Sequence, residues 1–150
     1  MRELHLGFTG SQWGMSNEQF ARVNQLVRDL KPTHVHHGMC VGADEQFHNI
    51  IRHARETLPD CIIIGHPPVD RGKMSGVKVD ELRLPKPYLE RDEDIAFESA
   101  ILLATPKEDK EKLRSGTWAT IRRARNHGRK VIRIQRDGVV IRETRKKVTA

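Results

Sequence analysis

The chain has 150 residues, of which 37% are hydrophobic and 31% are charged, and its formal net charge is +7; this length predicts a single domain spanning residues 1–150. It contains no apolar run long enough to cross a membrane and no signal-peptide pattern, which argues against a membrane partner and predicts a cytoplasmic protein. Two cysteines are too few for a disulfide framework.

Strand and helix patterns alternate along the chain. In order, we expect a strand at 4–8, a helix from Ser16, a strand at 33–37, a helix from Asp44, a strand at 61–64, a helix at 88–97, a strand at 100–104, a helix at 118–127 and a strand at 130–134. Such alternation is typical of a parallel sheet with helices on both faces.

Several local signals support these boundaries. Ser16 followed by Gln19 is a capping-box pattern, and Pro32 ends the helix that this pattern begins. The apolar residues 61–64 suit a strand that is buried on both faces. Gly128 is placed to end the last helix.

The C-terminal part predicts a hairpin and a tail. Asp137-Gly138 separates two β-rich runs, which favours a hairpin into residues 139–141. The basic tail from about residue 143 to 150 is expected to be flexible. The predicted fold class is therefore α/β, a Rossmann-like three-layer α/β/α arrangement with a mostly parallel five-stranded sheet and a C-terminal hairpin.

The most informative segment is the turn Ser115-Gly116-Thr117, which lies between an apolar strand and a helix. A glycine allows an anion to approach the backbone, and a helix N-terminus offers free N–H groups and a favourable dipole. Ser115 and Thr117 add hydroxyl donors. The segment therefore predicts a phosphate cradle.

Two more glycine-bearing turns follow predicted strands, at residues 7–11 and 38–44. In parallel α/β folds, ligands bind beyond the carboxyl ends of the strands, where these turns are expected to meet. The long segment 66–87 is expected at the same edge, either as a binding loop or lid or as a disordered insertion.

A family resemblance rests on the turns at residues 7–11, 38–44, 66–68, 88–91, 104–106 and 115–120. In these segments the chain resembles the SLOG superfamily, and within it the small YspA/YpsA-like branch, over residues 4 to about 135. The resemblance implies a Rossmann-like fold and a ligand such as a nucleotide, an ADP-ribose-like or NAD-like molecule, or a nucleotide second messenger. Its relatives include phosphoribohydrolases and the DNA-processing protein that binds single-stranded DNA.

The resemblance also implies ligand-binding residues in this chain. The residues matched to the family turns are Thr9, Gly10, Ser11, Gly42, Ala43, Asp44, His66, Pro67, Arg91, Arg114, Ser115, Gly116 and Thr117. Among them, Asp44 is expected to accept from a ribose hydroxyl or simply to begin a helix. Arg91 is expected to pair with a phosphate or with Glu90 or Asp94 at the surface. His66 is either a ligand contact or a structural turn residue.

The chain departs from the phosphoribohydrolase relatives at one position. These relatives have a catalytic glutamate three residues after the Gly-Thr pair, where this chain has Thr120. Cleavage of an N-glycosidic bond needs a carboxylate, and the remaining candidates are Asp44 and Glu98. The sequence therefore favours a binding protein, a sensor or sponge, over an N-glycosidase.

Other chemistries receive less support from the sequence. The histidines lack His-x-x-x-His spacing and there is no Cys-x-x-Cys, so neither a metal site nor a cofactor is predicted. Cys40 near a helix N-terminus could be an activated thiol or a small turn residue. Residues 114–150 hold 12 basic and 2 acidic residues, which leaves a nucleic-acid partner as an alternative. The resemblance further implies a homodimer.

Overall fold

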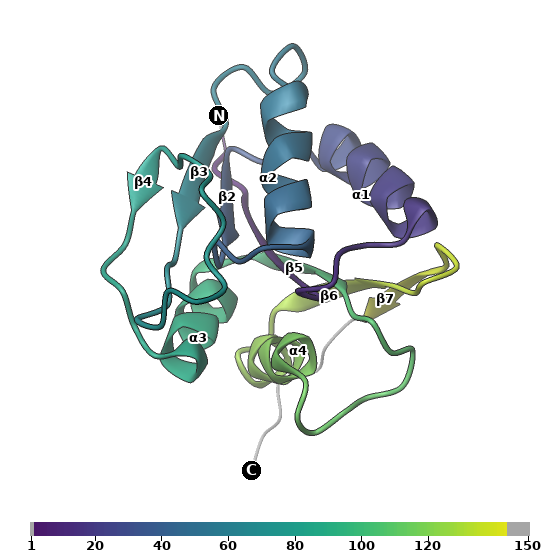
Figure 1. The fold of residues 1–150 in the computed structure, drawn as a ribbon. Helices are drawn as coiled ribbons and strands as arrows, with labels where there is room; N and C mark the ends of the chain where they lie inside the picture. Colours follow the sequence, from purple (N-terminus) through teal and green to yellow (C-terminus); the bar gives the residue numbers. More distant parts are fainter. Residues whose placement is uncertain (1, 144–150) are drawn as a thin grey trace.

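The computed structural model describes residues 2–143, and its elements follow the alternation expected from the sequence (Figure 1). The strands are β1 (His5–Gly10), β2 (His34–His37), β3 (Ile62–Gly65), β4 (Glu81–Leu82), β5 (Ile101–Thr105), β6 (Lys130–Ile134) and β7 (Val140–Glu143). The helices are α1 (Asn17–Leu30), α2 (Ala43–His53), α3 (Tyr88–Glu98) and α4 (Gly116–Asn126).

The strands form one sheet in the order β4-β3-β2-β1-β5-β6-β7. Every neighbouring pair is parallel except β6 and β7, which are antiparallel and form the predicted hairpin. The α/β class is therefore confirmed, but the expected count of five strands plus a hairpin omits β4. This strand has only two residues, both exposed, so no run or alternation of apolar residues marked it.

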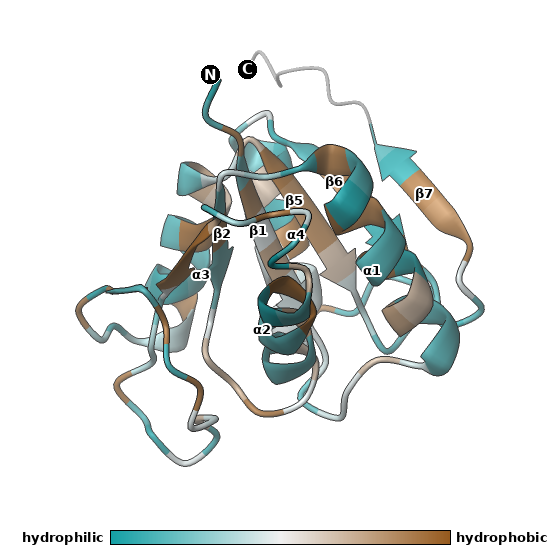
Figure 2. Ribbon diagram, turned by 90° about the horizontal axis from the view of Figure 1, so that it is seen from above, coloured by the Kyte–Doolittle hydropathy of each residue, from teal (hydrophilic) through white to brown (hydrophobic). Residues whose placement is uncertain are grey.

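Helices cover both faces of the sheet, which gives the predicted three layers (Figure 1). Helices α1 and α2 pack with Phe8 and Val35 into one apolar cluster. Helices α3 and α4 pack with Leu102 and Ala104 into a second cluster on the other face. Hydrophobic residues are concentrated in the central strands, and the helices carry hydrophilic residues on their outer sides (Figure 2). Neither face of the sheet is left bare.

Helix α1 begins as the capping box predicts. The Ser16 hydroxyl accepts from the Gln19 amide, and the Gln19 side chain accepts in return from the Ser16 amide. Gln19 is fully buried, and its side-chain nitrogen also donates to the carbonyls of Pro106 and Ile134. One side chain therefore caps α1 and attaches it to the ends of β5 and β6.

The long segment 66–87 is attached to the sheet. Its strand β4 pairs with β3, and a bridge joins Cys40 to Met74. The Val41 amide donates to the Lys73 carbonyl at 2.8 Å, and the Ser75 amide donates to the Met39 carbonyl at 2.9 Å. The segment is thus an ordered loop rather than the alternative, a disordered insertion.

Two sequence expectations concern the chain ends and membranes. The basic tail expected from about residue 143 falls outside the described residues from 144 onwards, whereas Glu143 itself belongs to β7. Among the helices of residues 2–143, none combines the length and the apolar character that a membrane span requires.

Candidate ligand pocket

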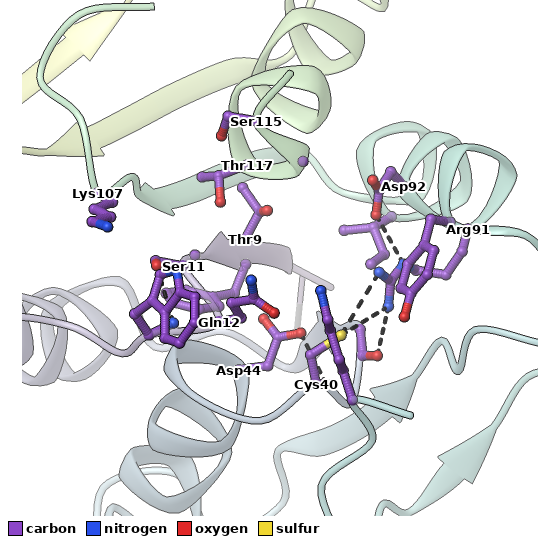
Figure 3. A pocket seen from close by; sticks show the side chains of 18 of the residues that line it. Thr9, Ser11, Gln12, Cys40, Asp44, Arg91, Asp92, Lys107, Ser115 and Thr117 are labelled. Carbon is purple, nitrogen blue, oxygen red and sulfur yellow. Dashed lines mark hydrogen bonds and ion pairs between the residues drawn. The ribbon is translucent and has the colours of Figure 1, made fainter. Parts of the chain in front are cut away.

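A pocket of about 470 Å³ lies beyond the carboxyl ends of β1 and β5 (Figure 3). These strands are neighbours in the sheet, but the chain leaves β1 toward β2 and reaches β5 only after returning across the sheet. The connections on either side of this point run to opposite faces, which opens a crevice between them. The pocket therefore occupies the place at which parallel α/β folds bind their ligands.

The N-terminus of α4 forms one wall of the pocket. The Ser115 hydroxyl caps the helix by accepting from the Trp118 amide at 3.2 Å. The amides of Gly116 and Thr117 donate to no group within residues 2–143, and a Cβ added to Gly116 would meet no atom within 4 Å. Both residues line the pocket, so two unpaired N–H donors and the positive end of the helix dipole lie at its wall, an arrangement that suits an anion.

The turn after β1 forms the pocket floor. Thr9, Gly10 and Ser11 all line the pocket, as predicted from the sequence. A Cβ on Gly10 would collide with the side chains of Thr105 and Ala43, so the close contact between β1, β5 and α2 requires glycine here. Ser11 supports the turn, because its hydroxyl accepts from the Trp13 amide and its carbonyl accepts from the Ala43 amide.

Of the three residues predicted to bind a ligand from the second turn, only Asp44 lines the pocket. Gly42 has φ 88° and abuts the backbone of Gln12, so it allows the chain to turn into α2. Neither Gly42 nor Ala43 lines the pocket, whereas Asp44 does. The Asp44 carboxylate accepts from the Cys40 amide at 3.2 Å. Gly42 and Ala43 thus position the carboxylate of Asp44.

Burial raises the pKa of the Asp44 carboxyl to about 6. The nearby Arg91 guanidinium opposes this rise but does not cancel it. Asp44 is only 7% exposed, and its opening to solvent is through the pocket. A carboxyl with such a pKa can either accept or donate a proton near neutral pH.

Arg91 lines the pocket, as predicted, but it is largely buried and is paired with Asp92 rather than with Glu90 or Asp94 at the surface. Its guanidinium donates to Asp92 at 2.8 Å and to the carbonyls of Gly38 and His66 at 2.6 and 3.2 Å. A Cβ on Gly38 would overlap the guanidinium. Most of the Arg91 donors therefore hold the loops after β2 and β3 against α3.

Cys40 is not an activated thiol in this fold. Burial raises the pKa of the Cys40 thiol, and the Asp44 carboxylate raises it further. Arg91 lies 3.9 Å from the sulfur and acts in the opposite direction, but more weakly. The proximity to the α2 N-terminus, which suggested a lowered pKa, is outweighed by the buried surroundings.

The rim of the pocket is cationic and carries one exposed aromatic ring. Lys73, Lys107 and Arg114 line the pocket, and none of them forms an ion pair within residues 2–143. Trp13 is 73% exposed, with the Lys107 ammonium 5.8 Å from its ring centroid. Phe8 also lines the pocket, but its ring stacks on Phe47 in the core. The exposed aromatic surface is therefore that of Trp13.

Some residues matched to the family turns lie elsewhere. His66 is buried against His36, and neither it nor Pro67 lines the pocket. Glu98, a candidate catalytic acid, lies at the far end of α3 in an ion pair with Arg83 at 2.6 Å and also lies outside the pocket. Of the two carboxylates named from the sequence, only Asp44 can reach a bound molecule.

The pocket also contains residues that the site predictions omitted. They are Gln12, Gly38, Cys40, Lys73, Tyr88, Leu89, Asp92, Ile95, Lys107 and Glu108. Lys107 and Glu108 directly follow β5, so their place after a predicted strand was a usable signal. Lys73 comes from the middle of the long loop, where no periodic pattern indicates direction.

Thr120 stands three residues after the Gly-Thr pair, at the position where a catalytic glutamate was sought in the sequence. Its hydroxyl donates to the Gly116 carbonyl at 3.0 Å and also lies beside the Asp92 carboxylate. Burial raises the pKa of the Asp92 carboxyl, while Arg91 lowers it. Helix α3 thus places a carboxylate next to the position at which α4 lacks one.

The basic residues of α4 and β6 are largely neutralised by acidic side chains. Arg125 pairs with Glu111 and with Glu143, at 2.9 and 2.7 Å. Glu111 also pairs with Arg122, and Arg123 pairs with Glu93. The positive charge that the sequence concentrates after residue 114 is therefore not a free cationic surface along this helix.

The fold resembles that of known structures. The molybdenum cofactor binding protein from the phototrophic bacterium Rippkaea orientalis has a TM-score of 0.67 and 18% identity, with 90% of this chain and 78% of that chain covered. The structural genomics target TM1055 has a TM-score of 0.60 and 14% identity, covering 85% and 72%. DNA processing protein A from Streptococcus pneumoniae has a TM-score of 0.59 and 16% identity, covering 88% of this chain and half of that protein.

The similarity to these structures extends over most of the chain and confirms the Rossmann-like α/β fold that the sequence predicts. No family model matches the sequence. No curated protein matches it either. At identities of 18% or lower, the structural similarity establishes the fold, and the function has to be argued from the pocket.

Proposed function

We propose that this chain is a SLOG-type protein that binds a nucleotide or a nucleotide-derived molecule, such as an ADP-ribose-like ligand or a nucleotide second messenger, as a sensor or sponge. The observation that carries the proposal is the pair of unpaired amides at Gly116 and Thr117, which face a pocket with a cationic rim. Backbone donors at a helix N-terminus are a recurrent phosphate site.

The pocket offers a partner for each part of such a ligand. A phosphate would rest on the α4 N-terminus, with Arg114 and Lys107 near its negative charge. The exposed Trp13 ring offers a stacking surface for a base. Asp44 lines the same pocket and can accept from a ribose hydroxyl. A volume of about 470 Å³ is within the usual range for small-molecule sites.

Calorimetric titration with AMP, ADP, NAD, ADP-ribose and cyclic dinucleotides tests the proposal. At least one of these should bind, and Thr117→Asp should abolish binding because it places a negative charge at the cradle. Arg114→Ala should weaken binding by roughly 10- to 100-fold, the range for a hydrogen bond to a charged group. Lys110→Ala removes an exposed cation from the same loop outside the pocket and should change nothing.

If the wild-type protein binds no compound of this panel, the proposed ligand class is wrong. Equal affinities of Thr117→Asp and wild type would instead show that the ligand lies elsewhere. Folding of each variant is checked by its thermal transition, which a bound ligand should shift upward in the wild type.

An N-glycosidase acting on nucleoside monophosphates or NAD-like molecules is the second candidate. It is favoured by the Asp44 carboxyl, whose raised pKa of about 6 suits a general acid, and by Asp92 beside Thr120. Chromatography of each ligand after incubation separates the two candidates. An intact ligand supports a binder, and release of free base that is lost in Asp44→Asn supports the hydrolase.

A homodimer and a nucleic-acid partner remain proposals from the sequence. The ion pairs of α4 weaken the case for nucleic acid, because Arg122, Arg123 and Arg125 are already paired with carboxylates. Light scattering of the purified protein measures its oligomeric state. A salt titration of binding to single-stranded DNA tests the other partner, since phosphate contacts make affinity fall steeply with salt.

A further inference from the structure

A second group of polar side chains lies outside the pocket, between the sheet and α3. His36 lies on β2, His66 directly follows β3, and Glu98 is the last residue of α3. One donor atom from each of these side chains lies within 4.8 Å of the others. No metal-binding spacing is visible in the sequence because the three residues come from separate elements that only the fold brings together.

The two histidines are arranged almost as metal ligands require. His36 Nδ1 and His66 Nε2 are 2.9 Å apart and share a hydrogen bond. Two nitrogens bound tetrahedrally to one Zn²⁺ at its usual bond lengths are separated by roughly 3.3 Å. The separation of the two nitrogens therefore has to grow by only a few tenths of an ångström, with a rotation of the rings that directs both nitrogens at the ion.

His5 is placed to orient the His36 ring. His5 Nδ1 and His36 Nε2 share a hydrogen bond of 2.8 Å. If His36 binds a metal through Nδ1, its remaining proton lies on Nε2 and is donated to His5. Metal-binding histidines usually have such a partner on the second ring nitrogen. The proton that His36 Nδ1 and His66 Nε2 now share must leave both of these atoms when an ion binds, either to another ring nitrogen or to solvent.

The carboxylate is held close to the histidines by the packing of α3. A Cβ on Gly7 would collide with Ser99, so glycine on β1 allows the end of α3 to approach the sheet. Arg83 donates to Glu98 Oε1 at 2.6 Å, and the second oxygen of this carboxylate does not accept from Arg83. A ligating carboxylate is commonly fixed by a hydrogen bond of this kind.

The two histidines are also removed from bulk solvent. His36 is fully buried and His66 is 2% exposed, so their ring nitrogens are shielded from water that would compete for an ion. Imidazole binds metal ions in its neutral form, which burial favours.

We propose that His36, His66 and Glu98 bind a divalent transition-metal ion of the zinc class. The set provides two imidazoles and one carboxylate, the donors that Zn²⁺ and similar ions accept, and it leaves one coordination position for water or another ligand. Glu98 is partly exposed, which gives the ion a route from solvent.

The test uses the full-length protein freed of metal by EDTA and titrated with Co²⁺, whose visible absorption reports its coordination geometry. We expect one Co²⁺ per chain with a low-symmetry spectrum, displaced by Zn²⁺. His66→Gln and Glu98→Gln should each weaken Co²⁺ binding at least about tenfold. Glu98→Gln changes a partly exposed residue, so it keeps the test valid if His66→Gln does not fold.

Two matched controls locate the ion. His53→Gln alters an exposed histidine of α2 that bonds only to its own helix, and it should bind Co²⁺ like the wild type. His34→Gln alters the more exposed group formed by Glu3, His5 and His34, which shares His5 with the proposed site but none of the three proposed ligands, and it should also bind normally. Absence of a Co²⁺ spectrum in the wild type, or loss of the spectrum in His34→Gln with Glu98→Gln unaffected, overturns the proposal.

Discussion

The protonation of Asp44 affects both the stability of the fold and the chemistry of the proposed ligand pocket. Burial favours its protonated form, which raises the carboxyl pKa from 3.8 to about 6. The folded state therefore binds a proton more tightly than the unfolded state does. The resulting stabilisation is present below pH 3.8 and is lost as the pH rises through about 6. At neutral pH, Asp44 is a destabilising charge kept within the pocket.

The Asp44→Asn substitution should therefore stabilise the folded protein, relative to the wild type, more at high pH than at low pH. The difference in free energy of unfolding between the Asp44→Asn variant and the wild type should grow by roughly 1.4 kcal/mol per pH unit within this window. Urea titrations at pH 4 and pH 7.5 measure it. Asp60→Asn, at an exposed position, is the matched control and should give no such trend. A constant difference would show that Asp44 is ionised throughout.

Trp13 is the second residue whose role can be separated from folding. The side chain is largely exposed, so Trp13→Ala should change stability by less than about 0.5 kcal/mol. If a base stacks on the ring, the same change should weaken ADP-ribose binding by about 1–3 kcal/mol. Pyrophosphate, which has no base, should bind both proteins equally. Leu113→Ala, at another exposed apolar side chain, serves as the control.

At the scale of elements, α4 combines a cap with the proposed cradle. The Ser115 hydroxyl satisfies the Trp118 amide, which leaves the first two amides of the helix to the pocket. Ser16 has the equivalent capping role in α1, away from the pocket. Both serines therefore cap a helix in a similar way, but only Ser115 lies at the pocket.

Ser115→Ala and Ser16→Ala should each lower the free energy of unfolding by about 1 kcal/mol, the usual cost of losing an N-cap. Only Ser115→Ala should also weaken ADP-ribose binding, because fraying of α4 misplaces the amides of Gly116 and Thr117. Chemical denaturation and calorimetry on the same samples measure both effects. Equal loss of ligand affinity in the two variants would assign the effect to global stability.

At the scale of the whole molecule, buried histidines make folding sensitive to acid. Burial lowers the pKa of His36 to about 2, of His37 to about 3 and of His66 to about 4, from 6.5. The unfolded chain binds protons at these positions below pH 6.5, whereas the folded protein does not. Stability is therefore complete above this pH and decreases as the pH falls toward 4.

Each of these histidines can contribute up to roughly 1.4 kcal/mol per pH unit to that decrease. We expect the urea midpoint to fall sharply between about pH 6.5 and 5, and the fall to be shallower in His37→Gln. The exposed His53→Gln should follow the wild type. A midpoint that is flat across this range would mean that the histidines are protonated in the folded state.

The fold could be predicted from local patterns because each pattern has a local cause. The Ser16 capping box and the apolar run at 61–64 identified α1 and β3 to within a residue. The strand β4 could not be found in this way, since its two exposed residues are held only by pairing with β3.

The candidate site was predictable where a side chain or amide directly follows a strand. The turns at Thr9–Ser11 and Ser115–Thr117 line the pocket because parallel strands end at one edge of the sheet. The sequence by itself therefore determined the α/β alternation and the edge at which a ligand is expected. It did so through periodicity, capping and glycine, which act over a few residues.

Only the tertiary structure decided which side chains share a space. Packing between distant segments buried Arg91 against Gly38, brought Asp92 beside Thr120 and turned His66 away from the pocket toward His36. These placements depend on burial and on contacts between elements that are far apart in the chain. Such contacts set the donor geometry on which both proposals rest, and no local pattern encodes them.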